Sequence, residues 1–244
     1  QTLMDAGWYQ SVGRAYAGGA SQRPPYDPTL DALQPVLAGG LSSIFEAGGE
    51  FEVIRALQIA KEFNLHPVIA GGGEAWKDAD RLKSVPVLLS LAFGEEPKDA
   101  PPPAKPGDED EPVDSRKTGE AKRLFLEKVH NAKVLDTAGI EFAFSTRGSR
   151  DASDFMSSLR RAVKEGLSKA TALKALTVAP AKIFGMSAKL GTLEVGKIAN
   201  VTVLTGDFLD EKSKVKMLYI DGRKIDPSKG SIAPAPRFNF GEEE

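Results

Sequence analysis

Several residue types are scarce in this 244-residue sequence, beginning with cysteine, which is absent. Without cysteine the chain forms no disulfide, thiolate metal site or cysteine nucleophile, and its composition fits either the cytoplasm or export. Histidine occurs twice, as His66 and His130. Because histidine is the commonest metal ligand and general base, two histidines exclude a histidine-rich metal site built by this sequence alone.

Long apolar runs and an excess of one charge are also missing. No run approaches the ~20 residues that span a bilayer, and the first residues lack the basic-then-apolar pattern of a signal peptide. With 32 basic and 34 acidic residues the net charge is −2, which gives no basis for expecting a nucleic-acid or anionic-membrane partner. Gln1 in first position fits a fragment, a mature form or an excised domain.

Apolar runs alternate with helical patterns along most of the chain. The runs at 41–48, 66–73, 85–93 and 140–146 predict four buried strands. Helical periodicity predicts helices over 50–64, 74–84 and 121–139, and two more within 151–185, where Gly166 ends the first and Ser168 caps the second. The strand–helix order, repeated four times, requires parallel strands with right-handed crossovers, and four such units are half of a (β/α)8 barrel.

The remaining segments set the domain boundaries. Residues 1–40 are predicted to be an extended or loop segment with a short helix at 27–37, and residues 41–188 form the barrel half. Residues 94–120 are rich in proline and acid and are expected to form a long loop. In residues 189–244, two strand-type segments at 191–207 and 215–226 have glycine-centred turns and predict a small antiparallel sheet, followed by a coil.

The closing third of the chain carries a set of motifs with the spacing of a known family. The runs "TVAPAKIFG", "GTLEVGKIANVTVLTGD" and "YIDGR" resemble the last segment of the amidohydrolase superfamily, close to its imidazolonepropionase-like and dihydroorotase-like branches. Weaker likeness extends upstream to about residue 41. The matching positions are Thr177, Pro180, Ala181, Gly185, Gly191, Leu193, Glu194, Gly196, Lys197, Ala199, Gly206, Asp207, Asp221 and Gly222.

The resemblance implies a fold and a chemistry. Relatives fold as a (β/α)8 barrel beside a β-sandwich built from both chain ends, and this chain would supply the second barrel half and the later sandwich strands. Relatives hold zinc or another divalent metal at the barrel mouth, where it activates a water molecule for hydrolysis of non-peptide C–N bonds. Their ligands are a first-strand histidine pair, one histidine on each of the fifth and sixth strands, and an aspartate at the end of the eighth.

Three of those ligand positions fall within this chain, and all three are changed. The resemblance places the fifth-strand histidine at Glu46, the sixth-strand histidine at Gly71 and the aspartate at Arg147, while the first-strand pair lies outside the sequence. A carboxylate at position 46 can still ligate a metal, but glycine offers no ligand and arginine repels a cation. We therefore expect no metal cofactor held by this chain.

Arg147 has two interpretations. It can form an anion site for a carboxylate or phosphate, or it can pair with Glu46 across the barrel mouth and fill the metal position. The ion pair is favoured, because a buried charge requires a partner and Glu46 is the nearest candidate.

The run "AGGGE" (70–74) also has two interpretations. As a phosphate-binding loop it lacks the Lys-Ser/Thr of a P-loop, so a tight strand-to-helix turn with close packing is favoured. Glu74 then places a favourable charge in a first helical turn, or contacts a ligand at the barrel mouth. Neither histidine is expected to ligate a metal: His66 starts a strand, at the face of the barrel that serves stability, and His130 is a surface or packing residue.

Together these observations predict an amidohydrolase-family chain without a complete metal site, which is inactive by itself. One alternative is a ligand-binding or scaffold module that uses Glu46, Glu74 and Arg147. Another is that residues outside this sequence complete a metal site with Glu46. Expected partners are a small molecule and either the remainder of a longer chain or a second copy, because half a barrel exposes its sheet edges unless residues 1–40 cover them.

Overall fold

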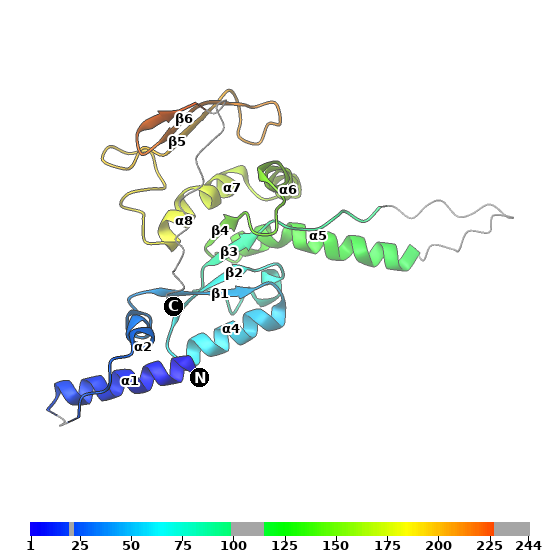
Figure 1. Ribbon diagram of the computed structural model, residues 1–244. Helices are drawn as coiled ribbons and strands as arrows, with labels where there is room; N and C mark the ends of the chain where they lie inside the picture. Colours follow the sequence, from blue (N-terminus) through cyan, green and yellow to red (C-terminus); the bar gives the residue numbers. More distant parts are fainter. Residues whose placement is uncertain (20–21, 99–114, 227–244) are drawn as a thin grey trace, which may run out of the picture.

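The computed structural model describes residues 1–19, 22–98 and 115–226, which form a four-stranded sheet with helices and a separate three-stranded sheet (Figure 1). The four strands of the first sheet are β1 (Ser42–Ala47), β2 (His66–Gly71), β3 (Val87–Ser90) and β4 (Phe142–Ser145). They are parallel and lie in the order β1-β2-β3-β4. This is the sequential order that right-handed crossovers produce, and it confirms the partial-barrel prediction.

Helical segments connect these strands on one face of the sheet. Helix α4 (Glu50–Glu62) follows β1, the short 3-10 helix η1 (Ala75–Asp78) follows β2, and α5 (Ser115–Thr137) precedes β4. After β4 come α6 (Ala152–Lys164), α7 (Lys169–Leu176) and α8 (Val178–Ile183). None of the described helices is long and apolar enough to cross a membrane.

Local chemistry explains where the helices begin and end. The Asp151 carboxylate accepts a hydrogen bond from the Asp154 backbone N–H at 2.8 Å and caps α6. Ser168 caps α7 as predicted, since its hydroxyl accepts from the Thr171 N–H at 3.0 Å. Gly166 lies between the two helices with φ +108°, a backbone conformation that favours glycine.

The core lies between the sheet and these helices. Because side chains alternate along a strand, every second strand residue faces the helices. These include Ile69, Val87, Leu89 and Phe142, all at most 5% exposed, and they pack with Val53, Leu135 and Leu159. We call the opposite side of the sheet the inner face. It is only partly covered, since Val68 and Ala143 are buried on it whereas Ile44 of the edge strand β1 is 53% exposed.

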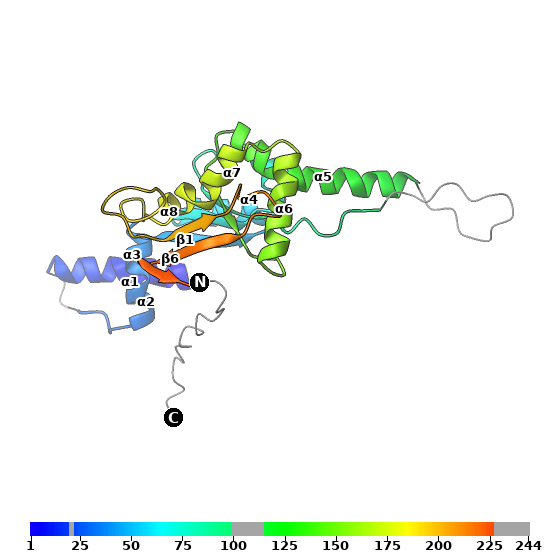
Figure 2. The same cartoon turned by 90° about the horizontal axis from the view of Figure 1, so that it is seen from above.

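The second sheet is antiparallel, as predicted. It contains β5 (Val201–Leu204), β6 (Val215–Ile220) and β7 (Arg223–Ile225), with β6 and β7 joined by an Asp221-Gly222 turn in which both residues have positive φ. Figure 1 shows this sheet on the side of α7 and α8, away from α4, and in the view from above in Figure 2 it overlaps the parallel sheet. The Arg160 side chain of α6 anchors the loop between β5 and β6 by donating a hydrogen bond to the Leu209 carbonyl at 2.7 Å.

The N-terminal segment differs from its prediction. Residues 1–40 were expected to be extended apart from a short helix, but α1 (Thr2–Ala17) is a 16-residue helix, followed by α2 (Pro28–Ala32) and α3 (Gln34–Leu37). Helix α1 packs on α2 and α3, where Ala6 is fully buried and the Gln34 side-chain amide donates to the Ala6 carbonyl. Four glycines and scattered polar residues weaken the apolar pattern of residues 1–19, which is why periodicity missed this helix.

Three further boundaries were wrong. Residues 74–84 form one turn of 3-10 helix and a series of turns in place of a helix. The helix predicted from residue 121 begins at 115, so it includes the end of the predicted 94–120 loop; residues 99–114 of that loop lie outside the described residues, as does the C-terminal coil from 227. The 151–185 segment contains three helices where two were expected, because the chain turns at Thr177 between α7 and α8.

Candidate functional site at the carboxyl edge of the parallel sheet

The carboxyl ends of the four parallel strands meet at one edge of the sheet, and the loops that follow them carry the candidate residues. In barrels of this kind that edge is the functional face. Glu46 lies at the end of β1, Gly71 ends β2, and Arg147 lies in the turn after β4. Residues about 100 positions apart in sequence therefore come together at this edge.

Glu46 and Arg147 form a bidentate ion pair. The two guanidinium nitrogens Nη1 and Nη2 of Arg147 donate to Oε1 and Oε2 of Glu46, the second at 2.7 Å. This confirms the predicted pairing across the mouth. The paired carboxylate raises the pKa of Arg147 above its usual value, first through the hydrogen bonds and then through charge attraction.

The exposure of this pair differs from the prediction. The Arg147 and Glu46 side chains are 58% and 66% exposed, so the argument from a buried charge was wrong. An exposed pair contributes little to stability. The turn that presents Arg147 is fixed separately: the Ser90 hydroxyl donates to the Arg147 carbonyl at 2.6 Å, and the Arg147 N–H donates to the Ser145 hydroxyl at 3.2 Å.

The register of the sheet decides which side chains share the inner face with Glu46. Phe45 and Ala47 pack toward α4, so Glu46 between them points to the inner face. Its register partner on β2 is Ala70, and therefore Ala70, one residue before Gly71, lies beside it on that face. The sequence alone could not show that Ala70 lies beside Glu46, because a one-residue difference in strand register exchanges the two faces of a strand.

Gly71 cannot simply be exchanged for a histidine. Its φ is +105°, and a Cβ at this position would lie 3.1 Å from the Ala47 carbonyl oxygen. The neighbouring glycines are also constrained: a Cβ on Gly72, at φ +55°, would lie 2.8 Å from Val87 Cγ1, and one on Gly73 would lie 3.3 Å from the Gly48 carbonyl oxygen. The glycine run is thus required for close packing of loops and strands, as the sequence favoured over a phosphate-binding loop.

The residues at this edge do not fit the divalent metal that the resemblance implies. A catalytic metal needs several converging donors, and residues 1–19, 22–98 and 115–226 contain no cluster of three or more histidine, cysteine or acidic side chains that could hold one. The Glu46 carboxylate, on the inner face, is bonded through both oxygens to a guanidinium. A cation at Glu46 would have to displace Arg147.

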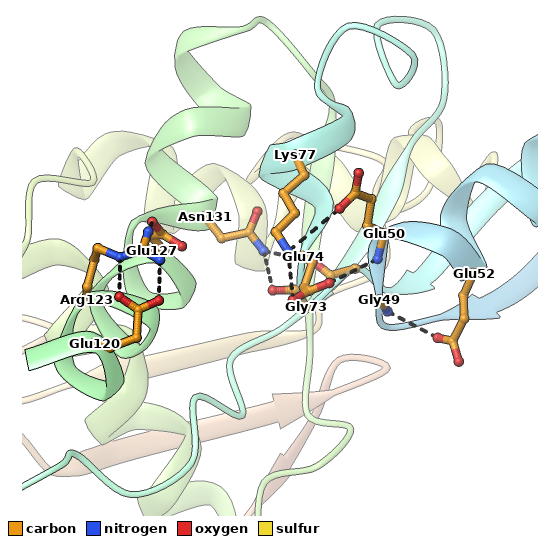
Figure 3. Close-up of polar contacts among 11 residues, drawn as sticks. Gly49, Glu50, Glu52, Gly73, Glu74, Lys77, Glu120, Arg123, Glu127 and Asn131 are labelled. Carbon is orange, nitrogen blue, oxygen red and sulfur yellow. Dashed lines mark hydrogen bonds and ion pairs between the residues drawn. The ribbon is translucent and has the colours of Figure 1, made fainter. Parts of the chain in front are cut away.

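Glu74 belongs to a separate polar network between two loops (Figure 3). Its Oε2 accepts from the Glu50 backbone N–H at 3.1 Å, at the start of α4, and its Oε1 accepts from Lys77 Nζ at 3.1 Å. Lys77 also lies 3.7 Å from the Glu50 carboxylate. The Glu50 N–H is the main reason why the pKa of Glu74 lies below its usual value, and Lys77 lowers it further.

Asn131 is a residue of this region that sequence reasoning missed. It is 2% exposed, and its Nδ2 donates to the Gly72 carbonyl at 2.7 Å, which holds the glycine loop against α5 (Figure 3). Its signal was present in the sequence, since an asparagine lies on the apolar face of the helix among Val129, Ala132 and Leu135. Buried polar side chains on such a face usually satisfy backbone groups of a neighbouring element.

A cavity of about 270 Å³ opens beside Glu74. The loops after β1, β2 and β3 line it together with Lys128 of α5. Neither Glu46 nor Arg147 takes part in its lining, so the mouth position and the cavity are two different places on the same edge.

The two histidines lie away from both places. His66 starts β2 at the amino edge of the sheet, as predicted. His130 lies on α5, with its Nε2 3.7 Å from the Glu165 carboxylate and its side chain 39% exposed.

Comparison with known proteins agrees with this architecture. Residues 120–225 match the sequence profile of the amidohydrolase family, a segment that makes up less than half of the chain. The partial barrel, the small antiparallel sheet and this match support the assignment of the chain to the amidohydrolase superfamily. No curated protein sequence matches the chain significantly.

Solved structures share the fold at low sequence identity. An amidohydrolase from Thermotoga maritima is 23% identical with a TM-score of 0.73, over 92% of this chain and 54% of its own. A Xaa-Pro dipeptidase with methionine bound in its active site is 18% identical with a TM-score of 0.54, over 89% and 57% of the two chains. A prolidase complexed with N-methylphosphonate-L-proline is 17% identical, with a TM-score of 0.53 over 89% and 57%. This chain thus spans little more than half the length of these relatives.

Proposed function

We propose that this chain is an amidohydrolase-superfamily domain without hydrolase activity of its own, in which the Glu46–Arg147 ion pair replaces metal ligation at the barrel mouth. The observation that carries the proposal is the bidentate geometry, which engages both carboxylate oxygens of Glu46. A free carboxylate would be an available metal ligand, whereas one paired in this way is already neutralised.

Electrostatics at the mouth favour the same conclusion. A divalent cation bound near Glu46 would lie within a few ångströms of the fixed positive charge of Arg147, and this repulsion opposes binding. Gly71 adds no donor and Ala70, beside Glu46, adds none either. The proposal also includes two finer assignments. One matches Glu46, Gly71 and Arg147 to particular metal-ligand positions of the superfamily, and the other is the branch of the superfamily.

Metal binding by the purified chain tests the proposal. The chain is incubated with zinc, dialysed and measured by elemental analysis. We expect substoichiometric zinc for the wild type. The variant Arg147→Asp, which places a carboxylate beside Glu46, should bind more zinc than Arg150→Asp, a matched charge change at a side chain that is 86% exposed and pairs with Asp154. Stoichiometric zinc in the wild type would overturn the proposal.

The competing ligand-binding module that uses Glu46, Glu74 and Arg147 together has less support. Glu46 and Arg147 are bonded to each other, and Glu74 is directed toward Glu50 and Lys77. The three side chains therefore do not face one common cavity in the described part of the chain.

We also propose that the inner face of the parallel sheet packs against a complementary barrel half, supplied by the rest of a longer chain or by a second copy. Ile44 is 53% exposed there, and helix α1 packs on α2 and α3 without covering it. If the partner is a second copy, sedimentation should show a dimer that Ile44→Glu dissociates and Leu193→Glu, at an 82% exposed site, does not. A monomer at all concentrations would contradict the second-copy form of the proposal.

A further inference from the structure

The cavity beside Glu74 has the size and rigidity of a small-molecule site. Its volume of about 270 Å³ lies just below the usual range for drug-sized ligands, which points to a smaller molecule. Its walls are fixed, because the Gly72 and Gly73 carbonyls accept from the buried Asn131 amide and the Glu74 N–H donates to the Gly48 carbonyl at 2.9 Å. A preformed wall reduces the entropy lost when a ligand binds.

Two opposite charges line this cavity without pairing directly. Glu74 contributes a carboxylate with a lowered pKa, and therefore a negative charge at neutral pH. Lys128, which also lines the cavity, is exposed and forms no ion pair or hydrogen bond within the described part of the chain. The positive charge of Lys128 helps to lower the pKa of Glu74, but the two groups are too far apart for a salt bridge.

Glu74 retains capacity for a further donor. A carboxylate has about four acceptor positions, of which the Glu50 N–H and Lys77 occupy one each. Lys128 keeps its own donors available, since an ammonium carries three. The cavity thus presents one acceptor group and one donor group, each ready for a charged partner.

Part of the lining is apolar. It consists of Ala92 and Phe93, and the Phe93 ring is held by an edge-on contact with Phe125 at 6.4 Å between ring centres. Ser90 also lines the cavity, but its hydroxyl is already used, because it donates to the Arg147 carbonyl and accepts from the Ala92 N–H. This part of the lining therefore favours a hydrocarbon group over a polar one.

We infer that the cavity binds a small zwitterion of the α-amino acid class, with its ammonium at Glu74, its carboxylate at Lys128 and an apolar side chain against Ala92 and Phe93. The assignment uses no residue of the Glu46–Arg147 pair, so it stands or falls independently of the proposed loss of catalysis.

Valine and two isosteres test the inference by amide NMR titration of the purified chain. Isovalerate lacks the ammonium of valine and isobutylamine lacks its carboxylate, while the hydrocarbon part is the same. We expect valine to shift the backbone amides of Gly48, Gly49 and Gly73 with millimolar affinity. Each isostere should bind roughly tenfold more weakly, because each loses one charge-assisted hydrogen bond.

Two lysine variants locate the site. Lys128→Ala should weaken valine binding roughly tenfold and leave the binding of isobutylamine unchanged, since that amine does not need the ammonium of Lys128. Lys117→Ala, a matched change at an exposed lysine on the same helix and outside the cavity, should change neither. Thermal unfolding of both variants checks that they remain folded.

Several results would overturn the inference. Isovalerate binding as tightly as valine would indicate a simple anion site, and equally tight isobutylamine would indicate a cation site. The inference is also wrong if valine shifts no cavity amide at high millimolar concentration, or if folded Lys128→Ala binds valine with wild-type affinity.

Discussion

Replacing Gly72 by alanine should destabilise the chain strongly, because two separate costs meet at this position. Its φ is +55°, and a Cβ would lie 2.8 Å from Cγ1 of Val87, which is fully buried. The left-handed backbone costs an alanine about 1–2 kcal/mol, and the forced overpacking adds about 1–3 kcal/mol. The expected total of about 2–5 kcal/mol is a large share of the stability of about 5–15 kcal/mol of a typical domain.

Gly139 provides a matched control for this substitution. It also has positive φ, +71°, but apart from its own chain neighbours no atom lies within 4 Å of the position that its Cβ would take. Gly139→Ala should therefore cost only the backbone term of about 1–2 kcal/mol. The difference between the two variants isolates the clash with Val87.

Urea unfolding followed by circular dichroism measures both variants. With a slope of about 2 kcal/mol per molar urea, Gly72→Ala should lower the midpoint by about 1–2.5 M, and Gly139→Ala by less than about 1 M. Equal losses in the two variants would refute the reasoning, because they would show that the glycine run is kept for backbone freedom alone and not for close packing against β3.

Three further outcomes are expected. Asn131→Ala should cost about 1–3 kcal/mol in the same urea assay, because it leaves the buried Gly72 carbonyl without its donor; an unchanged midpoint would show that the contact is dispensable. Leu159→Ala, at a fully buried site, should cost about 2–5 kcal/mol, whereas Leu173→Ala, at a site that is 47% exposed, should cost clearly less. The pKa of Glu74 is lowered by folding below its reference value of 4.5, so its stabilising effect is present above about pH 4.5 and is lost as the pH falls through the folded pKa. The stability advantage of the wild type over Glu74→Gln should therefore shrink on acidification, and a constant difference would contradict this origin of the shift.

The strand–helix order was predictable because each element of the barrel half has a strong local signal. Four apolar runs and the intervening periodicity gave the parallel sheet, and the glycine-centred turns gave the small antiparallel sheet. Helix α1 and the one-turn η1 were not predicted, since their conformation depends on packing more than on pattern: Ala6 is fully buried in α1, which packs on α2 and α3, and Asp78 is buried in η1.

The candidate site was predictable in part. Glu46 lies near the carboxyl end of a predicted strand and Arg147 follows another, so both were expected at one edge of the sheet. Their opposite charges predicted the pairing, although their exposure was misjudged. Lys128 and Asn131 could not be assigned to this edge from sequence, because α5 reaches it only through packing against the glycine loop. Strand register places Ala70, one residue before Gly71, beside Glu46, and no sequence pattern records this register.

The sequence by itself indicated the resemblance to the amidohydrolase superfamily, the order of the elements and the absence of histidine at positions 46, 71 and 147, because these follow from residue identity and local periodicity. Only the tertiary structure decided which side chains share a face, that both oxygens of Glu46 are bonded to Arg147, and that Glu74 and Lys128 line a common cavity. Those facts depend on strand register and on the approach of loops distant in sequence, which glycine makes possible by having no side chain and which no local pattern records.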